Sequence, residues 1–62
     1  MKIAKIVERG TFDKGSLQLR TGKKGTGKIL YERRWTNKRE RKEALEIARL
    51  TGAQLEYKVV ER

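Results

Sequence analysis

The chain has 62 residues, of which 35% are hydrophobic and 40% charged, and 17 Lys and Arg against 8 Asp and Glu give a formal net charge of +9. A chain of this length is expected to form one small domain over residues 1–62 with a small core, and it contains neither Cys nor His. The composition excludes a disulfide framework, the common zinc sites and catalysis by a thiol or an imidazole. We therefore expect a protein that is not an enzyme and that needs no cofactor or metal.

The positive charge is concentrated in the middle of the chain. Residues 14–42 hold eleven Lys or Arg against two Glu, a net of +9, whereas residues 1–13 carry +1 and residues 43–62 carry −1. Such localisation is typical of a surface that binds a polyanion, because a purely solubilising excess would be spread more evenly. Residues 1–7 include two lysines and no apolar run long enough for a signal peptide or a membrane span. We therefore expect a cytoplasmic protein that does not bind membranes.

The first part of the chain predicts two strands joined by a turn. Residues 2–9 read as a strand, but their apolar side chains do not alternate cleanly, so either face can be the inner one. Residues 10–15, GTFDKG, are a turn with a glycine at each end. We expect Phe12 to fold back on the core rather than to be exposed for binding a ligand. Leu17 and Leu19 then alternate with polar residues, which predicts a short second strand with one apolar face.

Residues 21–28, TGKKGTGK, predict a glycine-rich turn that carries three lysines. The segment 22–28 matches the first seven positions of the phosphate-loop pattern. However, Ile29 stands where Ser or Thr would bind magnesium, and a strand rather than a helix follows, so we reject nucleotide hydrolysis. Exposed N–H groups and lysines can still lie against a phosphate backbone, and a flexible hairpin tip is the alternative.

Residues 29–35 predict a third strand, in which Tyr31, Arg33 and Trp35 share one face. If exposed, this row would form a stacking platform for nucleic-acid bases. The alternative, which we prefer for Trp35, is that the aromatic side chains belong to the core and that a local twist or bulge displaces Arg33. Arg33 and Arg34 are candidates for a basic surface in either case.

The next segment predicts one amphipathic helix, whose apolar face consists of Ala44, Ile47, Ala48 and Thr51. Thr36 or Asn37 can cap its start, Glu40 fits a capping box, and Gly52 is expected to supply the left-handed residue that ends it. Four cations crowd the first turns, where the helix dipole disfavours them: Lys38, Arg39, Arg41 and Lys42. A bound phosphate backbone would relieve this repulsion, and pairing of Arg39 with Glu43 and of Lys42 with Glu46 is the alternative.

Leu55, Tyr57 and Val59 alternate with polar residues and predict a last strand. The resulting order, β-β-β-α-β, indicates an α+β fold of two layers. We expect a three-stranded antiparallel meander with one helix packed on one face and a C-terminal fourth strand. The expected core is Ile6, Leu17, Leu19, Tyr31, Trp35, Ala44, Ile47, Ala48, Leu55 and Tyr57.

One run of the sequence resembles the N-terminal arm-site DNA-binding domain of tyrosine-family integrases: Thr26-Gly-Lys-Ile, then Trp35-Thr-Asn-Lys-Arg-Glu40, then Glu43-Ala-Leu. That family has a Thr-Gly-Lys turn, a strand that ends in an aromatic residue and Thr, and a Lys/Arg-Glu-Ala helix start. The resemblance covers roughly residues 16–50 and implies a three-stranded sheet laid in the DNA major groove. The chain departs from the family pattern in two respects: Arg41 follows Glu40 where the family usually has Ala, and a strand follows the helix.

Two broader similarities concern the second half and the whole chain. The ending Gly52-Ala-Gln-Leu55 and the strand after it resemble small uncharacterised bacterial and archaeal helix–strand domains, which implies a fold and no activity. In size and charge the chain is similar to small archaeal chromatin proteins.

We therefore expect a non-catalytic nucleic-acid-binding protein that prefers double-stranded DNA to RNA and is nucleoid-associated if it binds DNA. Contact would be made through the outer sheet face and the glycine- and lysine-rich turn. The expected phosphate and groove contacts are Arg20, Lys23, Lys24, Lys28, Arg33, Arg34, Lys38 and Arg39. One alternative is a module for an acidic protein partner, whose apolar hot spot only Trp35, Tyr31 or Phe12 could provide. Another is a binder of single-stranded nucleic acid or RNA; no small-molecule substrate is expected.

Overall fold

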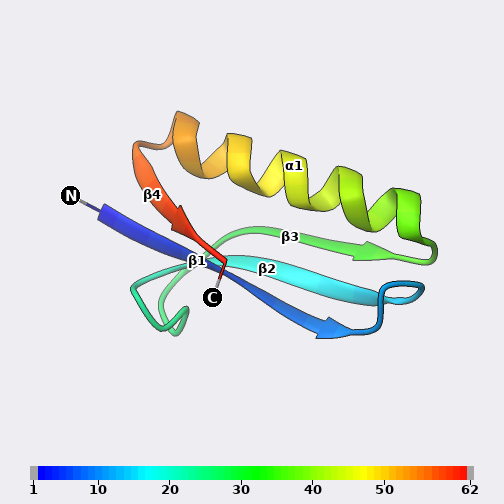
Figure 1. Ribbon diagram of the computed structural model, residues 1–62. Coiled ribbons are helices and arrows are strands. Elements are labelled where there is room, and N and C mark those ends of the chain that lie inside the picture. Colours follow the sequence, from blue (N-terminus) through cyan, green and yellow to red (C-terminus); the bar gives the residue numbers. More distant parts are fainter. Residues whose placement is uncertain (1, 62) are drawn as a thin grey trace.

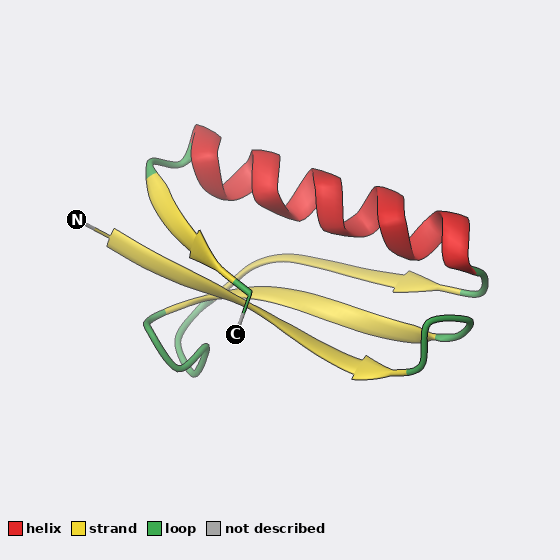
Figure 2. Ribbon diagram, viewed as in Figure 1, coloured by secondary structure: helices red, strands yellow, loops and turns green. Residues whose placement is uncertain are grey.

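The computed structural model describes residues 2–61 and shows one helix lying across one face of a four-stranded sheet (Figure 1). The elements are β1 (Lys2–Gly10), β2 (Gly15–Thr21), β3 (Ile29–Trp35), α1 (Lys38–Gln54) and β4 (Tyr57–Val60). Strand order is β3-β2-β1-β4, with β1 and β3 antiparallel to β2 and with β4 parallel to β1 (Figure 2). The predicted α+β fold and its β-β-β-α-β order are confirmed, and β4 joins the edge of the meander formed by β1.

The pairing registers decide which face of β1 is buried, a choice that the sequence left open. Ile6 pairs with Leu19 of β2, and Ala4 pairs with Val59 of β4, so these side chains lie together on the helix side of the sheet. Ala4 and Ile6 are both buried. Because side chains alternate along a strand, the residues between them point to the opposite face.

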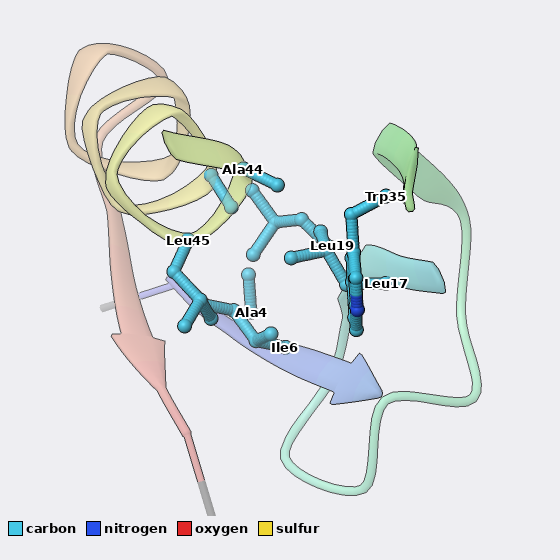
Figure 3. Close-up of a cluster of buried hydrophobic side chains, with 8 residues drawn as sticks. Ala4, Ile6, Leu17, Leu19, Trp35, Ala44 and Leu45 are labelled. Carbon is cyan, nitrogen blue, oxygen red and sulfur yellow. The ribbon is translucent and has the colours of Figure 1, made fainter. Parts of the chain in front are cut away.

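The core lies between the sheet and α1 (Figure 3). Its buried side chains are Ala4, Ile6, Leu17, Leu19, Trp35, Ala44, Leu45 and Ala48. Tyr31 and Tyr57 are partly buried and pack against this cluster, as do Leu30 and Val59. Each fully buried large apolar side chain contributes about 1.5–3 kcal/mol, so Leu17, Leu19 and Trp35 carry a large share of the stability of this small domain.

Two residues predicted for the core, Ile47 and Leu55, lie outside it: 39% of Ile47 and 46% of Leu55 are exposed. The buried stripe of α1 instead consists of Ala44, Leu45, Ala48 and Gly52. The prediction was wrong because the helix is turned so that Leu45, rather than Ile47, meets the sheet. Leu55 follows the last helical residue as its C-cap and therefore does not belong to β4.

Gly52 does not end the helix, as had been predicted, because α1 continues to Gln54. The left-handed residue is Glu56, with φ 63°, and the N–H of Leu55 donates to the carbonyl of Thr51 at 3.1 Å. Gly52 is buried, and a Cβ atom there would overlap Cγ2 of Val59. The glycine therefore allows β4 to approach the helix closely.

We expect Gly52→Ala to destabilise the protein by about 1–3 kcal/mol, because the added methyl group overpacks the contact with Val59. This loss would exceed the gain of up to about 1 kcal/mol that Ala normally gives inside a helix. Urea unfolding of the single variant and of Gly52→Ala combined with Val59→Ala measures the effect, since the second change removes the clashing group. A stabilised single variant would contradict the close contact.

Asn37 caps the start of α1 as predicted, but Glu40 reaches back to the N–H of Thr36 rather than to that of Asn37, as it would in a capping box. Its side-chain oxygen accepts from the N–H of Glu40 at 2.9 Å. The carboxylate of Glu40 accepts from the hydroxyl of Thr36 at 2.5 Å and from the Thr36 N–H at 3.0 Å. These Thr36 hydrogen bonds, with a smaller effect of nearby Arg33, hold the pKa of Glu40 below its usual value.

Trp35 is a core residue, as preferred, and only 2% of it is exposed. Its indole N–H donates to the carbonyl of Thr11 at 2.9 Å, which ties the end of β3 to the turn between β1 and β2. The prediction that Phe12 folds back on the core was wrong, because 63% of Phe12 is exposed. The Trp35 ring packs over Gly15 at this end of the sheet, where a Cβ would lie 2.9 Å from the ring.

Candidate nucleic-acid interface

The sheet face turned away from α1 carries a dense group of cations. We call it the open face, because the helix lies on the other side of the sheet (Figure 2). Strand alternation and the pairing registers assign its side chains to Ile3, Lys5, Val7, Arg9, Ser16, Gln18, Arg20, Ile29, Glu32, Arg34, Lys58 and Val60. Among these are five cations and one carboxylate, so the open face has a net charge of +4. It is thus the strongly basic layer of the fold.

A depression on the open face is lined by Val7, Arg9, Ser16, Gln18, Arg20, Glu32 and Arg34. Within it the side-chain amide of Gln18 donates to the carboxylate of Glu32, its neighbour across β2 and β3. The carboxylate of Glu32 thus bonds to an uncharged side chain and forms no ion pair with a cation of the open face. Arg9 and Arg34 are exposed and lie on strands on either side of Ser16, so both guanidinium groups are free to reach an anionic ligand.

The turn of residues 22–28 folds against the open face (Figure 1). Gly25 is buried, with φ +69°, and a Cβ atom there would lie 2.7 Å from Cγ2 of Val7 and 3.3 Å from Cβ of Lys5. Arg20 holds the turn in place, because its Nε donates to the carbonyl of Gly27 at 3.0 Å. The turn therefore brings three exposed lysines to the open face: Lys23, Lys24 and Lys28.

Several backbone N–H groups of this turn are used inside the protein, so the expected row of exposed donors is present only in part. Gly22 donates to the carbonyl of Ile3 at 2.8 Å, and Gly27 donates to the carbonyl of Thr21 at 2.9 Å. The N–H of Lys28 donates to the hydroxyl of Thr21 at 2.8 Å. These groups do not face a ligand, and the lysine side chains of the turn can contact a phosphate as point charges.

Three of the eight predicted contact residues lie away from the open face. Arg33 pairs with Leu17 and so belongs to the helix side of the sheet, where it is exposed because β3 is an edge strand. The bulge that was invoked to displace Arg33 lies elsewhere, between Leu19 and Arg20. Lys38 and Arg39 start α1 and form a surface beside Asp13. The structure thus groups Arg20, Arg34 and the three lysines of the turn, and separates Arg33, Lys38 and Arg39 from them.

Three cations of the open face were missed: Lys5, Arg9 and Lys58. Their signal was the alternation of Ala4 and Ile6 with Lys5 in β1, which the apolar residues Ile3 and Val7 on the other parity obscured. Lys58 was assigned to the polar side of the last strand but was not linked to a partner. All three were recognisable only once the pairing of β1 was known.

Cations of the helix side are partly neutralised by pairing. Arg41 contacts Glu8 of β1 at 2.9 Å, and Arg49 contacts Glu61 at 2.6 Å. The ion pairs found within residues 2–61 are therefore these two, rather than the pairs within α1 that the sequence suggested. Pairing with Glu61 raises the pKa of Arg49 and, through the same hydrogen bonds, lowers that of Glu61.

Comparison of the chain with protein-family models, with curated proteins and with solved structures finds no match. Over residues 2–61 the helix lacks the length and the apolar character of a membrane-crossing segment. The same residues bring no three His, Cys, Asp or Glu side chains together in a metal-binding arrangement.

Proposed function

We propose that this protein is a non-catalytic domain that binds double-stranded DNA through the open face and the turn of residues 22–28. The observation that carries this proposal is the five-to-one excess of cations over carboxylates on a sheet face that the helix leaves uncovered. The three lysines of the turn extend this basic surface. Lys and Arg side chains arranged in this way contact phosphate oxygens and position a protein on a duplex.

The placement of the aromatic residues favours a duplex over single strands. Trp35 is buried, and Tyr31 and Tyr57 pair with Leu19 and Lys2 on the helix side of the sheet. Non-specific binding of single strands relies on aromatic side chains that stack on bases, and the residues assigned to the open face include none. Phosphate contacts to a regular backbone remain as the main source of affinity.

The resemblance of residues 16–50 to integrase arm-site domains supports the same partner. It also supports DNA over RNA, since the major groove of A-form RNA is too narrow for a sheet to enter. If the protein binds DNA in the cell, it would be associated with the nucleoid.

We expect the affinity for duplex DNA to fall steeply with salt. If about five phosphates are neutralised, the slope of log K against log salt concentration should be near −4.5, at about 0.9 per phosphate. Fluorescence anisotropy of a labelled duplex, titrated at several NaCl concentrations, measures the slope. A salt-independent affinity, or no binding to the duplex at low salt, would contradict the proposal.

Competition separates DNA binding from plain attraction to polyanions. Polyglutamate and a single strand of matched length compete with the labelled duplex at one fixed salt concentration. We expect unlabelled duplex to displace the labelled one at a much lower concentration of charge than either competitor. Equal displacement by polyglutamate would favour the acidic-protein alternative for the open face.

A further inference from the structure

Phe12 lies exposed on the opposite side of the sheet from the open face. It belongs to the turn between β1 and β2, 63% of it is exposed, and the guanidinium group of Arg41 lies over its ring at 4.5 Å. Around this ring the surface is hollowed, and the lining consists of Glu8, Gly10, Thr11, Phe12 and Arg41, which we call the hairpin site. Since Arg41 belongs to α1, the hairpin site lies on the helix side of the sheet.

Several interactions hold Phe12 in this exposed position. The N–H of Thr11 donates to the carbonyl of Lys14 at 2.9 Å, which closes the turn around Phe12. The carbonyl of Thr11 in turn accepts from the buried Trp35 indole. Arg41 is fixed by Glu8, to which it donates at 2.9 and 3.2 Å. An aromatic side chain held in place before binding loses little conformational entropy on binding, which is typical of an interface hot spot.

The charges near the hairpin site indicate the kind of partner. Glu8 lines the hairpin site and forms an ion pair with Arg41, whereas Asp13 follows Phe12 in the sequence and lies outside the lining. Asp13 lines a second surface hollow together with Lys38 and Arg39, two predicted contact residues that do not lie on the open face. The Glu8–Arg41 ion pair leaves no net charge beside the ring, whereas Lys38 and Arg39 outnumber Asp13 in the outer hollow and attract carboxylates.

We propose that the hairpin site docks a protein segment that has one apolar anchor side chain flanked by acidic residues. The anchor packs on the exposed part of Phe12, and the acidic residues meet Lys38 and Arg39. This arrangement gives an apolar centre with a charged rim. The site is separate from the open face and does not depend on the proposed binding of DNA, so one molecule can carry both partners.

The test uses a synthetic peptide, Glu-Asp-Glu-Phe-Glu-Asp-Glu, blocked at both ends, and nitrogen-15 NMR spectra of the full chain. Trp35 is the only Trp, so its indole N–H gives one resolved signal, and its acceptor is next to Phe12. We expect this signal and the amide signal of Phe12 to shift and saturate with peptide. The side-chain amide of Gln18 reports on the open face. Any shift that the acidic peptide causes there should be the same for the peptide with Ala in place of Phe, whereas duplex DNA should move Gln18 and leave the hairpin site unchanged.

Matched variants identify the contact. Phe12→Ala should weaken peptide binding at least about tenfold, the loss expected for a hot spot. Leu50→Ala, which removes a comparably exposed apolar side chain from α1, should leave it unchanged. Thermal melts of both variants establish that the fold is intact. The same peptide with Ala in place of Phe should bind as weakly as Phe12→Ala does.

The proposal is overturned if the Trp35 signal does not move at millimolar peptide, or if the peptide with Ala binds equally well, since attraction would then be purely electrostatic. It is also overturned if the hairpin signals broaden with protein concentration alone, which would assign the site to a second copy of the chain. Shifts of the same signals by oligothymidylate would assign Phe12 to base stacking instead. Failure of any of these arms leaves the test of duplex binding by salt and competition unaffected.

Discussion

Ala48→Asp should leave the protein unfolded at room temperature. Ala48 is completely buried in the stripe of α1 that faces the sheet. An aspartate there would place a carboxylate in the core with no cation to pair with, at a cost of several kcal/mol. The single core of a domain of 62 residues without cysteines rarely supplies more than about 3–5 kcal/mol of stability. Circular dichroism melts of the variant should therefore show no cooperative transition.

Two controls make this result specific to the buried stripe. Lys42→Ala should change the free energy of unfolding by less than about 0.5 kcal/mol, because Lys42 is exposed on α1. Ile47→Asp is the sharper control, since 39% of Ile47 is exposed, and we expect this variant to keep a cooperative melt. If Ala48→Asp and Ile47→Asp were equally damaging, the orientation of the helix on the sheet would be wrong.

Reversing two charges of the open face should nearly abolish the binding of duplex DNA. Arg9→Glu combined with Arg34→Glu replaces two exposed cations with carboxylates while leaving intact the hydrogen bonds of Arg20 to the turn. Loss of two phosphate contacts should lower the salt slope by about 1.8 and the affinity at 0.1 M salt by about 10²-fold, and repulsion should add to this. Fluorescence anisotropy with the same labelled duplex measures both quantities.

The chain offers a control with the same change in net charge. Lys38→Glu combined with Arg39→Glu alters two cations at the start of α1, in the other layer of the fold. At 0.1 M salt exposed charges more than about 10 Å away are largely screened, so this pair should lower the affinity by less than about threefold. Equal losses for both double variants would mean that net charge, rather than the open face, attracts DNA.

Local chemistry made much of the fold predictable. The alternation of Leu17 and Leu19 with polar residues located β2, and the Asn37 and Glu40 pair located the start of α1, because these signals act over a few residues. The predicted end of the helix was wrong. Glycine is the residue type that commonly ends a helix, but Gly52 is required for the close contact with Val59. That requirement comes from β4, which lies beyond the helix in the sequence, so no local pattern contains it.

The candidate site was predictable only in part for a related reason. The sequence did not separate Arg34, which lies on the open face, from Arg33, which does not, because adjacent residues of a strand differ only in the face to which they point. Deciding between them required the register of β3 against β2 and the knowledge that β3 is an edge strand. Lys5 and Arg9 were missed because the buried parity of β1 is fixed by its pairing with β2 and β4.

The parallel pairing of β4 with β1 also sets an order in which the sheet can assemble. Lys2 pairs with Tyr57, 55 positions later in the chain, whereas β1, β2 and β3 pair with their neighbours in the sequence. Bringing distant segments together costs loop-closure entropy before their contacts form. The two hairpins can therefore form early, whereas the β1–β4 edge must wait until α1 has brought β4 across the sheet. Until then the backbone of β1 is an unpaired edge, and the short β4 is the element that protects it from pairing with other chains.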